Sequence, residues 1–292
     1  MIIVKLMGGL GNQMFQYAFG RRLAYVHNTQ LKLDLSEYFK QPENMPGYVC
    51  RDYDLDIFTL DAEFAREYEV LRLGRRSRTD RAERWLNKLL GPKKGRVIEP
   101  HFQFAKSAYN SPDNVHLVGY WQSEKYFADI EPELRSDFRF RQELSPASAN
   151  LLERIANSNS ICVNVRRGDF VTNDFLGSFG SDYFHMAETV IENRVADPVY
   201  FVFSDEIDWC KKNLKFRAQT VFVSHEYAGR KFQDYLRLMS GCKHFIIPNS
   251  SFAWWAVWFN QDPDKIVIAP NKWFNDSSVN TEDLIPDDWL RI

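Results

Sequence analysis

The chain has 292 residues, of which 45% are hydrophobic and 26% charged, so it has the composition of a soluble globular protein with room for two domains of roughly 150 residues. Its formal net charge of −2 argues against general nucleic-acid binding, which requires a strongly basic face. The four cysteines form no CxxC pair, which argues against structural zinc and suits a reducing compartment. No stretch approaches the ~18 apolar residues of a membrane-spanning helix, and the apolar start is too short for a signal peptide. We therefore expect a cytoplasmic protein.

The first residues predict the opening of an α/β domain. Residues 1–6 predict a strand, and the glycines at 8, 9 and 11 predict a tight turn. A helical stripe of apolar residues follows over 13–25, and 30–35 predicts a second strand. This loop lacks the third glycine of a dinucleotide fingerprint. We read it instead as a backbone loop beside a ligand, in which the amides of Asn12 and Gln13 bind hydroxyl groups.

Residues 63–96 predict a helix that is conspicuously basic from position 75 onward. A solvated amphipathic helix is the favoured interpretation, and contact with anionic lipid headgroups stays open as the alternative. Residues 132–146 are polar and form the candidate domain junction, with domains at 1–140 and 141–292. A 15% aromatic content fits a filled core, and Trp121 and Tyr126 are also candidates for sugar-stacking walls.

Strands and helices alternate through the second half of the chain. Strands are predicted at 161–166, 199–203, 220–223, 244–247 and 265–268, and helices at 182–194, 231–240 and 252–260. Such alternation is typical of a parallel sheet with helices on both faces.

Three polar loops follow strands of this second series, so they should converge on one edge of the sheet. They are Arg166-Arg167-Gly168-Asp169, Ser204-Asp205-Glu206 and Asn249-Ser250-Ser251. Arginine forks and a helix N-terminus both bind phosphate oxygens, and an acid after the neighbouring strand accepts from a guanine edge or a ribose. The pattern indicates a nucleotide-diphosphate donor site without a metal. The alternative interpretation is purely structural, with a salt-bridged Arg–Asp turn and a serine that serves as the N-cap of a helix.

Two features with possible metal ligands, an acidic motif and the histidines, are not interpreted as metal sites. The Asp52-Tyr53-Asp54 motif lies in an alternating segment that predicts a half-exposed strand, and the histidines show no ligand spacing. We expect no metal and no cofactor.

Several long motifs in the same order make the chain resemble the bacterial alpha-1,2-fucosyltransferases, an inverting glycosyltransferase family (family 11). They are GGLGNQMFQYAFGRRLA at 8–24, GYWQSEKYF at 119–127, VRRGDF at 165–170, FSDE at 203–206 and DYLRLMSGCKHFIIPNSSFAWWAVW at 234–258. The resemblance implies a GT-B fold of two Rossmann-like α/β domains facing a cleft. The C-terminal domain would then bind GDP-fucose, and the N-terminal domain would lie on the acceptor side.

The same resemblance implies roles for individual residues. Arg166 would stabilise the leaving diphosphate, with Arg167 and Asp169 supporting its loop. Asp205 would lie near the guanosine, and the donor would also contact the following positions: Gly11, Asn12, Gln13, Asn249, Ser250, Ser251 and Phe252.

Asn164 departs from the family pattern, which usually has histidine at that position. Asparagine cannot take a proton at neutral pH, so the general base is not identified by the resemblance. Asn164 could be a substrate contact, with Asp169 or a donor phosphate oxygen receiving the proton.

The expected reaction is inverting transfer of L-fucose from GDP-β-L-fucose to the 2-hydroxyl of a terminal galactose. Another metal-independent sugar-nucleotide transferase and a non-catalytic carbohydrate-binding protein are the alternatives. The acceptor is a galactoside-containing oligosaccharide or a lipid-linked glycan such as an O-antigen unit. The second of these would bring the enzyme to the inner face of the membrane as a peripheral protein.

Overall fold

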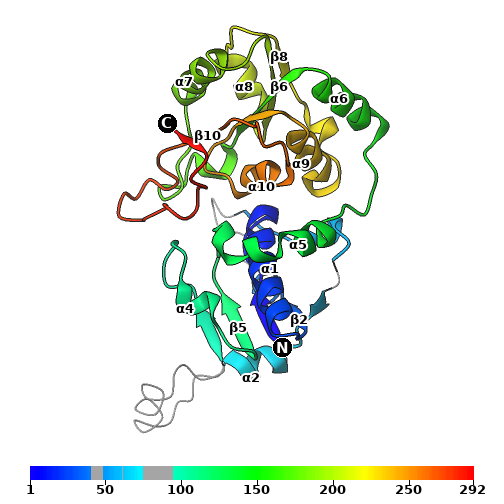
Figure 1. Cartoon of the computed structure of the whole chain (residues 1–292), viewed down its shortest axis with the longest axis vertical. Coiled ribbons are helices and arrows are strands. Elements are labelled where there is room, and N and C mark those ends of the chain that lie inside the picture. Colours follow the sequence, from blue (N-terminus) through cyan, green and yellow to red (C-terminus); the bar gives the residue numbers. More distant parts are fainter. Residues whose placement is uncertain (41–48, 61, 75–94) are drawn as a thin grey trace. The chain divides into compact units, whose positions relative to one another are not determined.

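The computed structural model describes residues 1–40, 49–60, 62–74 and 95–292 (Figure 1). The chain forms two compact units, and the first passes to the second between Arg139 and Phe140. The sequence prediction placed this boundary after residue 140. Each unit has its own sheet and its own buried core, and each is described separately below.

The first unit contains a five-stranded sheet in the order β3-β2-β1-β5-β4, with every pair of strands parallel. The strands are β1 (Ile2–Lys5), β2 (Leu31–Asp34), β3 (Glu63–Phe64), β4 (Arg96–Ile98) and β5 (Val115–Val118). The helices are α1 (Leu10–Val26), α2 (Glu67–Gly74), α4 (Lys106–Tyr109) and α5 (Glu131–Asp137). Short 3-10 turns include Leu55–Ile57, Glu124–Tyr126 and Ala128–Ile130. The predicted strand–glycine loop–helix–strand opening is confirmed.

Helix α1 is buried on most of its surface because it is packed between the sheet and a layer of aromatic side chains. A Cβ on Gly20 would lie 2.9 Å from Leu31 and 3.2 Å from Val4, so α1 lies directly on the strands. On its other side Phe19 packs 4.9 Å from Trp121 and 4.6 Å from Tyr126 between ring centroids. Trp121 and Tyr126 are fully buried, so they are core residues and not sugar-stacking walls.

The second unit contains a six-stranded parallel sheet in the order β11-β10-β9-β6-β7-β8. Its strands are β6 (Asn159–Val165), β7 (Pro198–Ser204), β8 (Thr220–Phe222), β9 (His244–Ile246), β10 (Val267–Ala269) and β11 (Leu290–Arg291). Its helices are α6 (Pro146–Ala156), α7 (Ser181–Glu192), α8 (Ile207–Asn213), α9 (Gln233–Ser240) and α10 (Ser251–Phe259). The predicted parallel sheet is confirmed.

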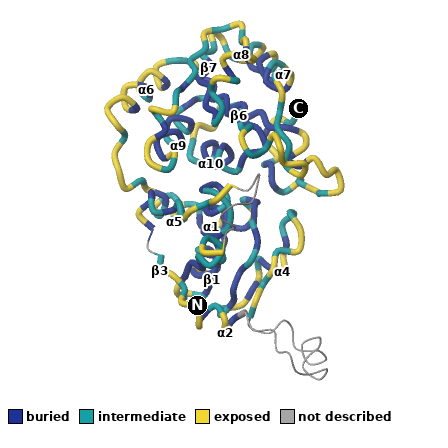
Figure 2. The backbone as a smooth tube through the Cα atoms, turned by 180° about the vertical axis from the view of Figure 1, so that it is seen from behind, coloured by how far each residue is buried: buried dark blue, intermediate teal, exposed yellow. Residues whose placement is uncertain are grey.

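Alternating side chains of β6 and β7 face two different helical layers, as period-two strands require. Ile161 and Val163 belong to a core cluster with residues of α7 and α8. On the opposite face Phe203 of β7 meets Tyr235 of α9 at 5.3 Å. Figure 2 shows the result: the central strands are dark blue, whereas α6 carries a yellow, exposed outer surface.

Three predictions differ from the structure. The segment around Asp54 is not a strand, because Leu55–Ile57 form a 3-10 turn whose apolar side chains are buried. Of the helix predicted over 63–96, residues 63–64 and 96–98 are strands and 67–74 are helical, while the basic stretch 75–94 lies outside the described residues. Helices α6 and α8 were not predicted. Within the described part of the chain, no helix is long and apolar enough to cross a membrane.

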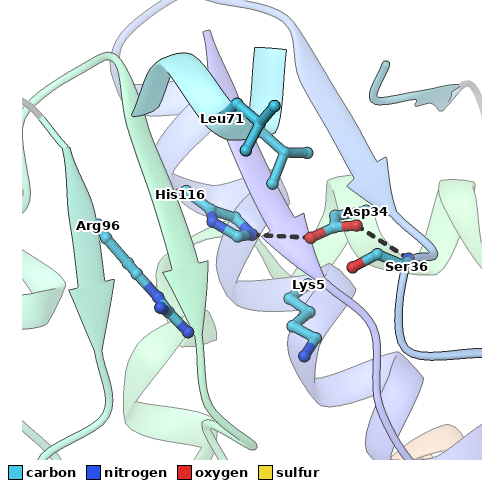
Figure 3. Close-up of a pocket in the computed structure, with 7 residues that line it drawn as sticks. Lys5, Asp34, Ser36, Leu71, Arg96 and His116 are labelled. Carbon is cyan, nitrogen blue, oxygen red and sulfur yellow. Dashed lines mark hydrogen bonds and ion pairs between the residues drawn. The ribbon is translucent and has the colours of Figure 1, made fainter. Parts of the chain in front are cut away.

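The α2 face of the first sheet is unusually polar and contains a cavity of about 250 Å³ (Figure 3). Its lining residues are Lys5, Asp34, Ser36, Val70, Leu71, Arg96 and His116. Nε2 of His116 lies 3.1 Å from Oδ2 of Asp34, although the two atoms are not aligned as a well-directed hydrogen bond. Burial alone would raise the pKa of Asp34, but the contact with His116 and the N–H of Ser36 outweigh it and lower that pKa.

Replacing Asp34 with alanine should destabilise the first unit in a pH-dependent way. The change leaves the partly buried Ser36 N–H without its acceptor and removes the carboxylate beside His116, which costs about 1–3 kcal/mol of unfolding free energy at neutral pH. Because the folded-state pKa of Asp34 is lowered, its contribution is present above the unfolded value and is lost as the pH falls below ~4. Denaturant unfolding at several pH values measures this. Asp208→Ala, at an 83% exposed carboxylate, is the control and should change nothing.

Candidate functional site

The strand order of the second sheet indicates which edge is the candidate ligand site. Counting from β6, the order β8-β7-β6-β9-β10-β11 is that of a Rossmann sheet, and its direction reverses between β6 and β9. Ligands of open α/β sheets bind outside the carboxyl ends of the strands at such a reversal. The arginine loop after β6 and the serine loop after β9 flank this position, as the sequence predicted.

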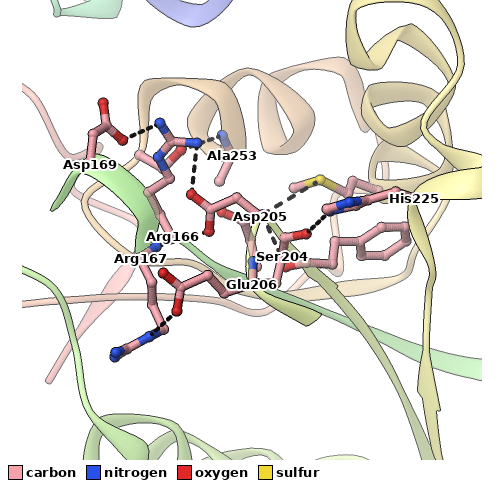
Figure 4. A network of polar contacts seen from close by, with 12 residues as sticks. Arg166, Arg167, Asp169, Ser204, Asp205, Glu206, His225 and Ala253 are labelled. Atoms are coloured by element: carbon pink, nitrogen blue, oxygen red, sulfur yellow. Dashed lines mark hydrogen bonds and ion pairs between the residues drawn. The ribbon is translucent and has the colours of Figure 1, made fainter. Parts of the chain in front are cut away.

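Arg166 is held at this edge by two carboxylates (Figure 4). Its guanidinium pairs with Asp169 in the same loop and with Oδ2 of Asp205, 3.0 Å away, after β7. The side chain is 27% exposed, so part of the fork still faces solvent. A guanidinium held in this way is already oriented to receive a phosphate oxygen.

Asp205 organises the loop through both of its oxygens. While Oδ2 pairs with Arg166, Oδ1 accepts the backbone N–H of Arg167 at 3.0 Å. Gly168 is required for this approach, because a Cβ at that position would lie 2.7 Å from Oδ2 of Asp205. The predicted contact of Asp205 with the guanosine stays a prediction, and its contact with the arginine loop is what the structure contains.

Arg167 does not join Arg166 in a two-arginine cradle. Its Nε donates to Glu206 at 3.0 Å, and its guanidinium lies 3.9 Å from the ring centroid of Trp209. In Figure 4 the side chain runs away from Arg166. Of the two cations, Arg166 is therefore the one held by Asp169 and Asp205, and Arg167 anchors the loop to α8. The contact of Arg166 with a phosphate stays a prediction.

The serine loop contains the N-cap of a helix and a buried asparagine that donates to two backbone carbonyls. Ser250 is the N-cap of α10, and its Oγ accepts from the N–H of Ala253 at 3.4 Å. The predicted structural role of this serine as a helix N-cap is therefore confirmed. Ser251 and Phe252 form the first turn and are half-buried. Asn249 is 2% exposed, and its amide donates to the carbonyls of Leu176 (2.7 Å) and Trp273 (3.0 Å).

Asn164 is a buried residue of β6 with contacts inside the second unit. It is 7% exposed, and its Nδ2 lies 3.4 Å from the carbonyl oxygen of Phe203 and 4.0 Å from the sulfur of Met239. These contacts give Asn164 a structural role between β7 and α9. A contact with substrate stays a prediction.

In the first unit the glycine loop leads directly into α1, which begins at Leu10 and includes Gly11 as a buried helical residue. Gly8 has φ of +72°, and a Cβ there would lie 2.4 Å from Nδ2 of Asn12. Oδ1 of Asn12 accepts from Nε2 of Gln122 at 2.7 Å, which joins the loops after β1 and β5. Asn12 is therefore at the carboxyl edge of the first sheet, and its predicted contact with a ligand stays a prediction.

Gln13 is not available to a ligand, and here the prediction needs correction. The side chain is fully buried, its Nε2 donates to the carbonyls of Gly8 (3.0 Å) and Asp52 (2.8 Å), and its Oε1 accepts the N–H of Asp54 at 2.8 Å. Gln13 thus fixes the Asp52–Asp54 segment against α1. Among the described residues, no group of three or more His, Cys, Asp or Glu side chains is arranged to hold a metal.

A strained loop after β8 was missed from the sequence. Lys231 and Phe232 both have positive φ (51° and 62°), which is costly for residues other than glycine and clusters at functional sites. Phe232 is 47% exposed, and its ring lies 6.3 Å from that of His225. No local pattern signals such a conformation, because tertiary contacts impose it.

Comparison with known proteins agrees with this geometry. A family model described as "Glycosyl transferase family 11" matches residues 64–292. The chain is 31% identical to an alpha-1,2-colitosyltransferase of Escherichia coli over 100% of this chain and 98% of that one. It is 23% identical to galactoside alpha-(1,2)-fucosyltransferase 2 of Rattus norvegicus, over 88% of this chain and 66% of the other.

Among solved structures, Arabidopsis thaliana FUT1 in complex with GDP superposes with a TM-score of 0.50 at 11% identity, covering 91% of this chain and 69% of that one. This likeness concerns the fold, which is the GT-B arrangement of two Rossmann-like domains. Together with the parallel sheets, the extent of the family match leads to one conclusion: the chain belongs to glycosyl transferase family 11, and glycosyl transfer is its chemistry.

Proposed function

We propose that the chain transfers L-fucose from GDP-β-L-fucose to the 2-hydroxyl of a terminal galactose, with inversion at the anomeric carbon, to form an alpha-1,2 linkage. The donor would bind at the carboxyl edge of the second sheet, and the acceptor at that of the first. The observation that carries this proposal is the position of Arg166 beside the reversal of strand order, paired with Asp169 and Asp205.

The leaving group of this reaction requires positive charge and N–H donors. As the bond from fucose C1 to the β-phosphate oxygen breaks, negative charge grows on the diphosphate. Arg166 would neutralise that charge, and the first-turn N–H groups of the nine-residue helix α10 would donate to the same oxygens. Since both groups are oriented before the donor arrives, little reorganisation accompanies the reaction.

The strained loop after β8 supplies a surface for the nucleobase. Phe232 is 47% exposed in the loop between β8 and α9, and its ring lies 5.9 Å from that of Tyr235, which packs on Phe203 of β7. A flat aromatic ring stacks on a purine regardless of its hydrogen-bonding pattern. We assign the base position to Phe232 on this ground.

The identity of the transferred sugar is the first alternative to test. Because one relative transfers colitose, which is fucose without its 3-hydroxyl group, GDP-colitose is the competing donor. A panel of both donors with β-galactosides, followed by NMR of the product linkage, decides between them. Measuring activity in EDTA tests the expected independence from metals. Measuring GDP binding tests the other alternative, because a carbohydrate-binding protein without activity would not bind GDP.

Arg166→Ala should lower kcat by about 100-fold or more, because a preorganised donor at the developing charge is removed. GDP release from GDP-fucose in the presence of lactose measures this. The fold should be unchanged, since Arg166 is at the edge of the sheet. Lys211→Ala is the matched control, because it also removes a cation but lies on the exposed surface of α8. Turnover of Arg166→Ala within a few-fold of the wild type would contradict the assignment.

Gly168→Ala should weaken GDP binding by roughly 10-fold, because the added Cβ would lie 2.7 Å from Oδ2 of Asp205 and push the arginine loop away from its carboxylate. Isothermal titration with GDP measures the affinity. Gly180→Ala is a matched control, since a Cβ at that position meets no atom within 4 Å. Equal GDP affinities for the two alanine variants would show that the loop does not depend on Asp205.

A further inference from the structure

Glu99 is a carboxylate at the carboxyl edge of the first sheet that no motif had indicated. It follows β4 directly, and its own N–H still donates to the carbonyl of Val118 at 2.9 Å, so it remains part of the sheet edge. The strand order of this sheet reverses between β1 and β5. Glu99 thus lies beside the loop that follows β5, at the edge where ligands of such sheets bind.

The loop after β5 is shaped around this carboxylate. Oε2 of Glu99 accepts the N–H of Tyr120 at 2.6 Å, and Oε1 accepts the N–H of Trp121 at 2.9 Å. Trp121 has φ of +56°, a strained conformation that turns its N–H toward the carboxylate. A Cβ on Gly119 would lie 2.3 Å from the Cβ of Glu99, so only glycine permits this approach.

The carboxylate keeps capacity to accept a proton. Each oxygen receives one N–H bond, whereas an ionised carboxylate has about four lone-pair sites. Burial raises the pKa of Glu99 to about 7, although the two N–H donors act in the opposite direction. No charged side chain of the described residues contributes to this shift, whereas Glu37, Arg51 and Asp54 act electrostatically on Tyr38.

The surroundings of Glu99 have the chemistry of a sugar subsite. The half-buried rings of Phe102 and Tyr120 lie side by side, with centroids 6.4 Å apart and planes inclined by 18°. Aromatic faces of this kind pack against the apolar face of a hexose. The amides of Asn12 and Gln122 lie on the neighbouring loops of the same edge.

We propose that Glu99 is the general base that removes the proton from the acceptor hydroxyl. This inference rests on the proposed function and supplies the base that the buried Asn164 cannot provide. The acceptor oxygen forms a bond to fucose C1 while the bond from C1 to the β-phosphate oxygen breaks. The bonding electrons leave with GDP, and the hydroxyl proton passes to the Glu99 carboxylate. The Phe102–Tyr120 pair orients the acceptor sugar.

Glu99→Gln is the decisive variant, because it keeps the size of the side chain and removes its basicity. With GDP-fucose and lactose, kcat should fall about 100-fold or more, which is the contribution of a positioned base. In the wild type kcat/KM should rise with pH as Glu99 loses its proton and level off above that transition. This acid limb should be absent from the residual activity of Glu99→Gln. The GDP affinity should stay unchanged, since the donor site lies in the other unit.

A purely structural Glu99 would behave differently. In that case Glu99→Gln would lower the thermal stability but keep the acid limb, and this outcome would overturn the inference. If Glu99→Gln fails to fold, Glu99→Asp replaces it. We then expect a reduced kcat and an acid limb displaced along the pH axis. An acid limb at the wild-type pH would contradict the role of Glu99 as the general base. Glu131→Gln, at an exposed carboxylate of α5, is the control. Absence of transfer and of GDP binding in the wild type would instead reject the proposed function.

Discussion

The Asp205 carboxylate connects the loops that follow two neighbouring strands, and the candidate donor site depends on this connection. One oxygen pairs with the guanidinium of Arg166, and the other accepts the backbone N–H of Arg167. Without this bridge, two adjacent cations would repel each other at the end of β6. With it, one arginine is directed at the edge of the sheet, while the other pairs with Glu206 and packs on Trp209. Gly168 makes the bridge possible because it leaves room for the carboxylate.

In the first unit a carboxylate also connects the segments that follow two neighbouring strands, but its surroundings differ. Glu99 also follows a strand, also accepts backbone N–H groups of a neighbouring loop, and also lies against a glycine. Its partners are neutral, however, so burial dominates and its pKa rises toward neutrality. A carboxylate paired with an arginine positions that cation, whereas a carboxylate among N–H groups and aromatic rings is suited to proton transfer.

Much of the candidate site could be predicted from local patterns. Alternating apolar residues ending in Arg166, in Ser204 and before Asn249 indicated strands whose polar loops meet at one edge, and the parallel sheet brings them there. The patterns failed where a side chain turns inward. The amides of Gln13 and Asn249 have the chemistry to bind a ligand, but their NH2 groups donate to backbone carbonyls far away in the sequence. The DxD segment, read as a strand, is a 3-10 turn because Leu55 and Ile57 are drawn into the core.

By itself, the sequence determined the α/β class, the parallel second sheet, the arginine and serine loops and the membership in the family, because these follow from short-range periodicity and from contiguous motifs. Tertiary structure alone decided which of these groups face a ligand. Glu99 meets Tyr120 and Trp121 across about twenty residues of chain, and Arg167 turns toward α8 and away from Arg166. The physical reason is that the direction of a side chain and the pKa of a carboxyl depend on burial and on partners that are remote in the sequence.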